Sequence, residues 1–190
     1  DQLPRFFTQH RIVQKAQSEA PAGPHRESFL NLLPEVESSV LRFAELLRDQ
    51  AVSQLPHTVT HGDFWASNIC VSDEGSTVLD LDCYSFEPRV TDFARAANWY
   101  YQTRSASENA SLFRHFQEKA RLSVQEAEAL PLMMCAHDLY YAIGHVLLFL
   151  HENPESQARL LARIQFEIRA PERYQQDRDR IRHMFMRDAW

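Results

Sequence analysis

The chain has 190 residues, of which 44% are hydrophobic and 24% charged, and its formal net charge is -6. This length suits one domain with a sizeable core, and a composition near the globular average excludes a disordered, collagen-like or low-complexity protein. The negative charge argues against a nucleic-acid or anionic-membrane partner, because both favour a basic surface. Three cysteines form no disulfide framework, so we expect a cytoplasmic protein.

The first part of the chain ends in a turn-rich stretch, EAPAGPHRES, which is dense in Pro, Gly and Ser. We therefore interpret residues 1–26 as a linker or partial inter-lobe segment, and residues 27–190 as one helical lobe. From Leu33 the apolar residues recur at three- and four-residue spacing. This periodicity predicts a helix that ends near Gln54 and has Pro34 in its first turn.

The pattern changes between residues 57 and 83. The short runs HTVTH, NICVS and TVLDLD are β-branched or alternate in polarity, which predicts strands. The tripeptide DEG at 73–75 predicts a hairpin turn between the last two runs. We therefore expect a small β-loop insertion in a chain that is otherwise helical.

After Pro88 the pattern is helical to the end of the chain. One helix is predicted from Val90, and the S-x-x-E spacing of Ser123 and Glu126 predicts another that begins with a capping box. Two further helices are predicted to begin at prolines, Pro154 and Pro171. The sequence therefore predicts an α+β fold that is mainly α.

The most apolar stretch, residues 130–150, is long enough to cross a bilayer. It carries His137, Asp138 and His145, which are costly groups in hydrocarbon. We interpret it as a buried core helix and expect no membrane partner.

Side chains able to carry chemistry concentrate in the segment HGDFWASN. His61, Asp63 and Asn68 follow the spacing H-x-D-x-x-x-x-N, and Asp80 comes later, at the end of an apolar run. In phosphoryl transfer an Asp on a rigid loop accepts the proton of the attacking hydroxyl, while an Asn and a second Asp bind Mg²⁺. Mg²⁺ prefers hard oxygen ligands and takes one or two carboxylates. Asp63, Asn68 and Asp80 match this requirement in type and order.

Two motifs resemble the aminoglycoside phosphotransferase and choline kinase superfamily. HGDFWASN resembles its catalytic loop, and VLDLDCYSFEPRVTDFA resembles its next motif, a strand that ends in a metal-binding Asp and leads to a helix opened by D-[LF]-A. The stretch DFARAANWYY is similar to the homoserine kinase-like branch. The resemblance covers roughly residues 35–185. It implies the C-terminal helical lobe of a protein-kinase-like fold, with the N-terminal β lobe absent.

The resemblance also implies roles for individual residues. Asp63 would be the catalytic base, and Asn68 and Asp80 would bind Mg²⁺, with ATP as the co-substrate. Two further residues would support them: His61 as a structural residue of the loop, and Asp92 as a brace from the following helix.

The roles of five other residues stay open. Strand alternation puts Asp82 on the same face as Asp80, where it is either a second ligand or a solvated neighbour. In this family helices of the lobe line the substrate cleft, which gives four candidates for substrate binding: Trp99, His137, Asp138 and Tyr141. An acidic residue there would suit a cationic amine.

The parts that clamp ATP are not evident. Kinases of this type need a smaller lobe with a phosphate-covering loop and a lysine. Gly23 is the only glycine before Gly62, and Lys15 is typical of a solvated surface lysine. We therefore expect the chain to lack the ATP clamp and to need an N-terminal lobe in cis.

Our leading hypothesis is the catalytic lobe of an ATP-dependent small-molecule kinase, which transfers the γ-phosphoryl group to an amino alcohol, a homoserine-like or an aminoglycoside-like acceptor. One alternative is an isolated, catalytically incomplete lobe that acts as a binding or interaction module. A second is a metal-dependent phosphohydrolase, in which His61 would join the His137–Asp138 dipeptide. That site would need several ligands that project from helices.

Overall fold

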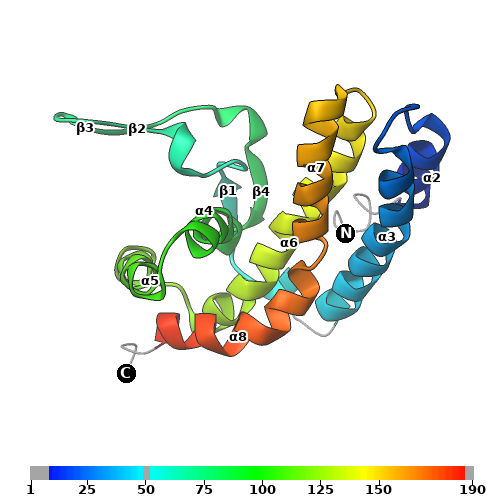
Figure 1. Ribbon diagram of the computed structural model, residues 1–190. Helices are drawn as coiled ribbons and strands as arrows, with labels where there is room; N and C mark the ends of the chain where they lie inside the picture. Colours follow the sequence, from blue (N-terminus) through cyan, green and yellow to red (C-terminus); the bar gives the residue numbers. More distant parts are fainter. Residues whose placement is uncertain (1–8, 49–51, 187–190) are drawn as a thin grey trace. The chain divides into compact units, whose positions relative to one another are not determined.

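The computed structural model describes residues 9–48 and 52–186, and the chain divides into two compact units (Figure 1). Unit 1 contains residues 1–46 and 138–173, and unit 2 contains residues 47–137 and 174–190. Three helices, α3 (Arg26–Arg48), α6 (Val124–Phe149) and α8 (Ala170–Met186), contribute residues to both units.

Unit 1 is built from helices. α2 (Gln9–Glu19), α3 (Arg26–Arg48) and α7 (Pro154–Glu167) pack with the second half of α6 around one apolar core (Figure 1). Phe29 and Phe149 stack at its centre, with 3.9 Å between the ring centroids. The other core residues lie at helical spacing and are Val13, Ala16, Leu32, Leu33, Val36, Ala142, Val146, Leu161, Ile164 and Ile168.

Helix α3 begins earlier than its sequence pattern predicts. It starts at Arg26 and carries Pro34 in its interior, so the expected place of Pro34 in the first turn is wrong. An interior proline costs about 3 kcal/mol. Burying Phe29 and Leu33 contributes about 1.5–3 kcal/mol for each side chain, which outweighs that cost. The predicted end near Gln54 is also wrong, because Val52–Gln54 forms a separate 3-10 turn.

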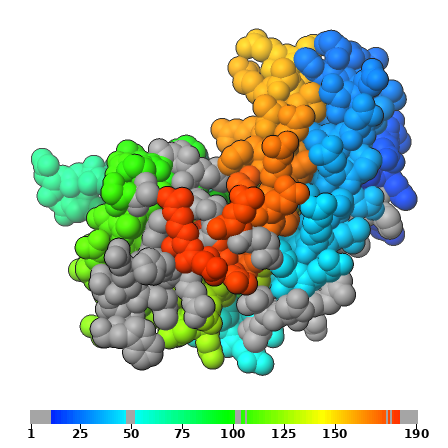
Figure 2. All heavy atoms as spheres, turned by 60° about the horizontal axis from the view of Figure 1, so that its bottom comes forward, coloured from blue at the N-terminus to red at the C-terminus, as the bar shows by residue number. Residues whose placement is uncertain are grey.

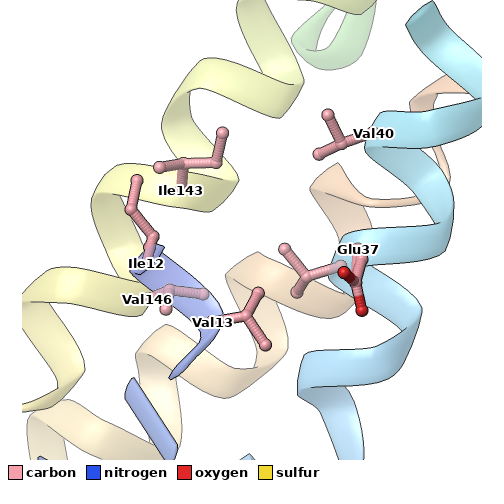
Figure 3. A pocket seen from close by; sticks show the side chains of 7 residues that line it. Ile12, Val13, Glu37, Val40, Ile143 and Val146 are labelled. Atoms are coloured by element: carbon pink, nitrogen blue, oxygen red, sulfur yellow. The ribbon is translucent and has the colours of Figure 1, made fainter. Parts of the chain in front are cut away.

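Residues 9–19 of the expected linker form α2, and they belong to the same compact unit as the first part of α3. A small apolar pocket lies between α2, α3 and α6 (Figure 3). Its lining is aliphatic except for Glu37, and none of the residues predicted to carry chemistry contributes to it.

Unit 2 contains two antiparallel ribbons. β2 (Ile69–Ser72) and β3 (Gly75–Val78) form the predicted hairpin, which projects from the helices of its unit (Figures 1 and 2). β1 (His57–Thr60) pairs with β4 (Ser85–Pro88), a strand that the sequence pattern did not indicate. The two strands that enclose the candidate site segment in the sequence are therefore neighbours in space.

The β1–β4 ribbon has an inverted polarity. Val59 and Phe86 are cross-strand partners and are 68% and 72% exposed. On the other face Thr60 is buried, and its Oγ1 donates a hydrogen bond to Glu87 Oε1 at 2.7 Å. At these positions the ribbon turns the polar Thr60 inward and the apolar Val59 and Phe86 toward solvent.

Most helices that follow the β segment begin where the sequence predicts. α4 (Val90–Thr103) starts at Val90, and α5 (Ala106–Ala120) follows it. The capping box of α6 is present, because Glu126 N donates to Ser123 Oγ and Ser123 N donates to Glu126 Oε2. Pro154 opens α7 and Pro171 lies in the first turn of α8. The expected α+β, mainly α class is confirmed.

Helix α6 is long and apolar enough to cross a membrane by length and composition alone. Half of its most apolar window, 50%, is buried inside the protein. Core helices share these properties with membrane spans, and one such helix is weak support for a membrane protein.

A bidentate ion pair joins the start of α4 to α6. Arg89 Nε lies 2.5 Å from Glu126 Oε1, and Arg89 Nη2 lies 2.8 Å from Glu126 Oε2, while the Glu126 side chain is fully buried. Arg89 also donates to the carbonyls of Ala120 and Arg121 at the end of α5. Burial raises the pKa of Glu126, but the hydrogen bonds from Arg89 and Ser123 outweigh burial and leave that pKa lowered.

Replacing Arg89 should therefore destabilise the protein. Arg89→Ala leaves a buried carboxylate unpaired, and we expect the free energy of unfolding in urea to fall by about 2–4 kcal/mol, because Arg89 is itself partly exposed. This loss of stability should be fully present above pH 4.5, the usual pKa of a Glu side chain. It should disappear as the pH falls through the lowered pKa of Glu126. Arg159→Ala, which breaks an exposed pair with Glu155, is the control and should cost less than about 1 kcal/mol. Equal losses would contradict this role of Arg89.

Candidate functional site

The HGD turn (His61, Gly62, Asp63) follows β1 directly. Asp63 N donates to His61 Nδ1 at 3.2 Å, and the distance from His61 Nε2 to Leu79 O is 2.8 Å. Because Nδ1 accepts a hydrogen bond, the ring proton lies on Nε2 and is donated to Leu79. The buried His61 ring therefore ties the HGD turn to the residue that precedes Asp80.

Gly62 is required by a close approach of two backbone segments. Its φ is +82°, and a Cβ atom placed on it would lie 1.7 Å from Cys83 O. A side chain at this position would be strained in conformation and would overlap the backbone. Glycine therefore allows the HGD turn to lie against the 3-10 turn Leu81–Cys83.

A carboxylate at the start of α4 holds the backbone of the same turn. Asp92 Oδ2 accepts from His61 N at 2.7 Å, and Asp92 Oδ1 accepts from Gly62 N at 3.2 Å. Arg95 Nη1 donates to Asp92 Oδ1 at 3.0 Å and to Glu87 Oε1 at 2.8 Å. Asp92, which the resemblance predicts to support the loop, is therefore itself held by Arg95, and Arg95 is held by Glu87. The sequence did not indicate these two residues.

The amide of Asn68 holds Asp63. Asn68 Nδ2 donates to Asp63 O and to Asp63 Oδ2, both at 2.9 Å. Asn68 lies at the end of the 3-10 turn Ala66–Asn68. Its backbone carbonyl oxygen accepts a hydrogen bond from Leu79 N at 2.8 Å. The side-chain nitrogen of Asn68 donates to Asp63, so the side-chain oxygen Oδ1 is the atom with which Asn68 could bind a metal.

Asp80 has a left-handed backbone with φ 60° and ψ 69°. This conformation costs a non-glycine residue about 1–2 kcal/mol and is found at functional positions. Leu81–Cys83 is a 3-10 turn, so the expectation that strand alternation puts Asp80 and Asp82 on one face is wrong. Both aspartates are exposed, and Asp80 follows directly after the residue that His61 and Asn68 hold.

The donor set of the predicted Mg²⁺ site fits the metal. Mg²⁺ takes one or two protein carboxylates and completes its shell with phosphates and waters. Asn68 Oδ1 and the exposed Asp80 carboxylate are donors of that type. Among residues 9–48 and 52–186 no group of three or more His, Cys, Asp or Glu side chains is placed to hold a metal. The cluster of ligands that a phosphohydrolase would need is therefore not found in this part of the chain.

Two of the four substrate candidates lie in unit 2 with the HGD turn. Trp99 is 41% exposed and makes an edge-to-face contact with Trp65, with 5.7 Å between ring centroids. Asn98 Nδ2 lies 3.3 Å from His137 Nδ1. Burial lowers the pKa of His137 to about 4, with the charge of Arg95 acting in the same direction and that of Asp63 opposing it. A pKa of about 4 leaves the His137 ring neutral at pH 7.

The other two candidates lie in unit 1. Asp138 is buried and paired with Arg173 Nη2, and the Tyr141 ring contacts Tyr140 and His145. Because Arg173 already balances its charge, Asp138 is poorly suited to bind a cationic amine. The neighbouring residues His137 and Asp138 thus have different surroundings.

The close approach at Gly62 predicts a large effect of adding one methyl group. Gly62→Ala should lower the free energy of unfolding by about 2–5 kcal/mol, through the left-handed backbone and the overlap with Cys83. Gly144→Ala is the matched control, because Gly144 lies inside α6 with no atom within 4 Å of the added Cβ. It should stabilise the protein by about 0.4–1 kcal/mol. Thermal and urea unfolding measure both, and a tolerated Gly62→Ala would contradict the contact.

Comparison with known proteins agrees with this geometry. A family model described as the phosphotransferase enzyme family (APH) matches residues 5–127. This match covers more than half of the chain and includes the HGD turn, Asn68, Asp80 and Asp92. A search of curated proteins finds no match. The chain belongs to the phosphotransferase enzyme family.

Proposed function

We propose that this chain is the catalytic lobe of an ATP-dependent small-molecule kinase, which transfers the γ-phosphoryl group to a substrate hydroxyl. The observation that carries the proposal is that Asp63 is held in place by hydrogen bonds. Asn68 donates to its carboxylate, and Asp92 accepts from the backbone N–H groups of the two residues that precede Asp63. The acceptors that we propose are amino alcohols, homoserine-like amino acids and aminoglycoside-like molecules. The reaction would take place in the cytoplasm, where ATP is supplied.

In this proposal Asp63 accepts the proton of the attacking alcohol. A general base contributes about 10²- to 10⁴-fold when it is held within hydrogen-bond reach of that proton. Asn68 keeps the carboxylate in one orientation, and the hydrogen bonds from the HGD turn to Asp92 keep its backbone in place. Such preorganisation is the main contribution of a protein to phosphoryl transfer.

Two oxygen donors would hold the metal. Asn68 through Oδ1 and Asp80 through its carboxylate would bind Mg²⁺, which when bound with ATP neutralises charge on the phosphates. The strained backbone of Asp80 supports this role, because strain persists where the surrounding structure enforces it.

The base can be tested by a substitution that keeps its shape. Asp63→Asn should reduce phosphate transfer from Mg²⁺-ATP to a panel of hydroxyl acceptors by about 10²- to 10⁴-fold, in a form of the protein that carries a second lobe. The circular dichroism and unfolding midpoint should be unchanged. Asp179→Asn on α8, where the side chain is 80% exposed, is the control and should keep full activity. Retained transfer in Asp63→Asn would show that Asp63 is not the base.

We further infer that this lobe works with a second, β-rich lobe in cis, which supplies the lysine and the phosphate-covering loop. The support is an exposed apolar surface on residues 59–86. Its members are more than half exposed and comprise Val59 (68%), Val71 (75%), Leu81 (60%), Tyr84 (70%) and Phe86 (72%). Of these, Val59 and Phe86 are cross-strand partners and therefore form an adjacent exposed apolar pair, which favours an interaction site on this ribbon. The same observation favours the alternative that the isolated lobe acts as a binding module.

Calorimetry distinguishes a lobe that needs a second lobe to bind ATP from a lobe that binds ATP alone. The chain alone should show no micromolar binding of Mg²⁺-ATP and no turnover, because the groups that clamp the phosphates would come from the second lobe. Adding that lobe should restore both. Micromolar binding and turnover by the chain alone would overturn the inference and show that the lobe is complete as an enzyme.

A further inference from the structure

Helix α4 contacts the site loop (residues 61–68) at two points. Asp92, in the first turn of the helix, accepts hydrogen bonds from the backbone of the HGD turn. Trp99 lies about two turns further along, on the same face of the helix. Its ring meets that of Trp65 edge to face, with 5.7 Å between the centroids and 73° between the ring planes. One face of α4 therefore holds both the start and the middle of the site loop.

Trp65 connects this ring contact to Asp63 through the backbone of the loop. The carbonyl oxygen of Trp65 accepts a hydrogen bond from Asn68 N at 3.0 Å. Asn68 Nδ2 in turn donates to the backbone carbonyl and to the carboxylate of Asp63, both at 2.9 Å. A displacement of Trp65 would therefore displace Asn68, and with it the donor that orients the Asp63 carboxylate.

The ring of Trp65 is held by packing. Its Nε1 atom is buried and has no hydrogen-bond partner among the residues that the structure describes. A buried indole N–H usually has such a partner, which fixes the ring. Here packing must fix it instead, and Trp99 supplies an aromatic contact with a defined geometry. Because Trp99 is 41% exposed, this contact lies at the surface of the helix and not in the core of unit 2.

We propose that Trp99 is a positioning residue for Asp63, and that it acts by holding Trp65 and, through it, Asn68. This rests on the proposed function, in which Asp63 is the base and Asn68 a metal ligand. Asp92 would then fix the backbone of the HGD turn, while Trp99 fixes the segment that carries Asn68. The resemblance makes Trp99 a candidate for substrate binding, and the two roles predict different kinetics.

Amide hydrogen exchange, measured by NMR on the ¹⁵N-labelled chain, tests the contact without activity. In Trp99→Leu the backbone amide of Asn68, which donates to Trp65, should exchange about 3- to 10-fold faster, the size expected for a lost aromatic pair. Trp99→Phe keeps an aromatic ring and should stay within about 2-fold of the original chain. Phe116→Leu is the matched control, because it removes an edge-to-face contact of similar geometry between α5 and Phe93 of α4, with 5.6 Å between centroids and 71° between planes. Unchanged exchange in Trp99→Leu, or an equal rise in Phe116→Leu, would overturn the proposal.

Kinetics separates positioning from substrate binding. The protein with its second lobe is assayed with Mg²⁺-ATP and the fastest acceptor among amino alcohols, homoserine-like amino acids and aminoglycoside-like molecules. In Trp99→Leu we expect kcat to fall about 3- to 10-fold with both KM values unchanged, and in Trp99→Phe to stay within about 2-fold of the original. Phe116→Leu should keep the full rate. A higher KM for the acceptor with kcat unchanged would show that Trp99 binds the substrate, and would overturn the positioning role.

A double-mutant cycle tests whether Trp99 acts through Trp65. The single variants Trp65→Leu and Trp99→Leu remove the same ring contact from its two sides. If the proposal holds, their effects on kcat do not multiply, and the double variant is no slower than Trp65→Leu alone. Effects that multiply would show that the two residues act independently, which contradicts the proposal.

The proposed function and the role of Trp99 fail in different ways. If the unaltered protein with its second lobe transfers no phosphate, the proposed function fails, while hydrogen exchange still decides whether Trp99 holds the loop. If it transfers phosphate and Trp99→Leu is as fast as the original, only the role of Trp99 fails. If urea unfolding shows that Trp99→Leu does not fold, Trp65→Leu decides instead, because the Asn68 amide should also exchange faster there and unchanged exchange would overturn the proposal.

Discussion

The structure of the site depends on one close backbone approach, that of Gly62 to the carbonyl of Cys83. It brings the HGD turn against the 3-10 turn that follows Asp80, so the predicted base and the predicted metal ligand are held by adjoining segments. Packed this closely, the backbone amides of the turn need partners, and Asp92 accepts two of them. The three residues of the HGD turn therefore depend on one another, because a single backbone conformation positions all of them.

A single cation balances the carboxylates that support this conformation. Arg95 bonds both Asp92 and Glu87, and its side chain is only 18% exposed. Burial raises the pKa of Glu87, but the charge of Arg95 and the hydrogen bond from Thr60 outweigh burial and leave it lowered. The Glu87 carboxylate therefore stays ionised as an acceptor. Burial lowers the pKa of His137, and the charge of the same Arg95 acts in the same direction.

The sequence predicted the parts of the site that are local in the chain. Asn68 is close enough to Asp63 for a loop motif to encode their contact, and the helix start at Val90 places Asp92. Arg95 and Asn98 gave no signal, because their roles depend on partners from other elements. Pro34 and Asp80 were misjudged for a related reason: burial and close packing there impose backbone conformations that local preference disfavours.

The inverted β1–β4 ribbon connects the chemistry of the site to its outer surface. Its inward face must be polar, because Thr60 and Glu87 complete the network that holds Arg95. In a two-stranded ribbon successive side chains point to opposite faces, so Val59 and Phe86 then point outward. Apolar side chains in that position gain nothing from the lobe that carries them, and a second lobe that covers them would bury both. The network that orders Asp63 and the exposed apolar pair of Val59 and Phe86 are therefore on two faces of the same pair of strands.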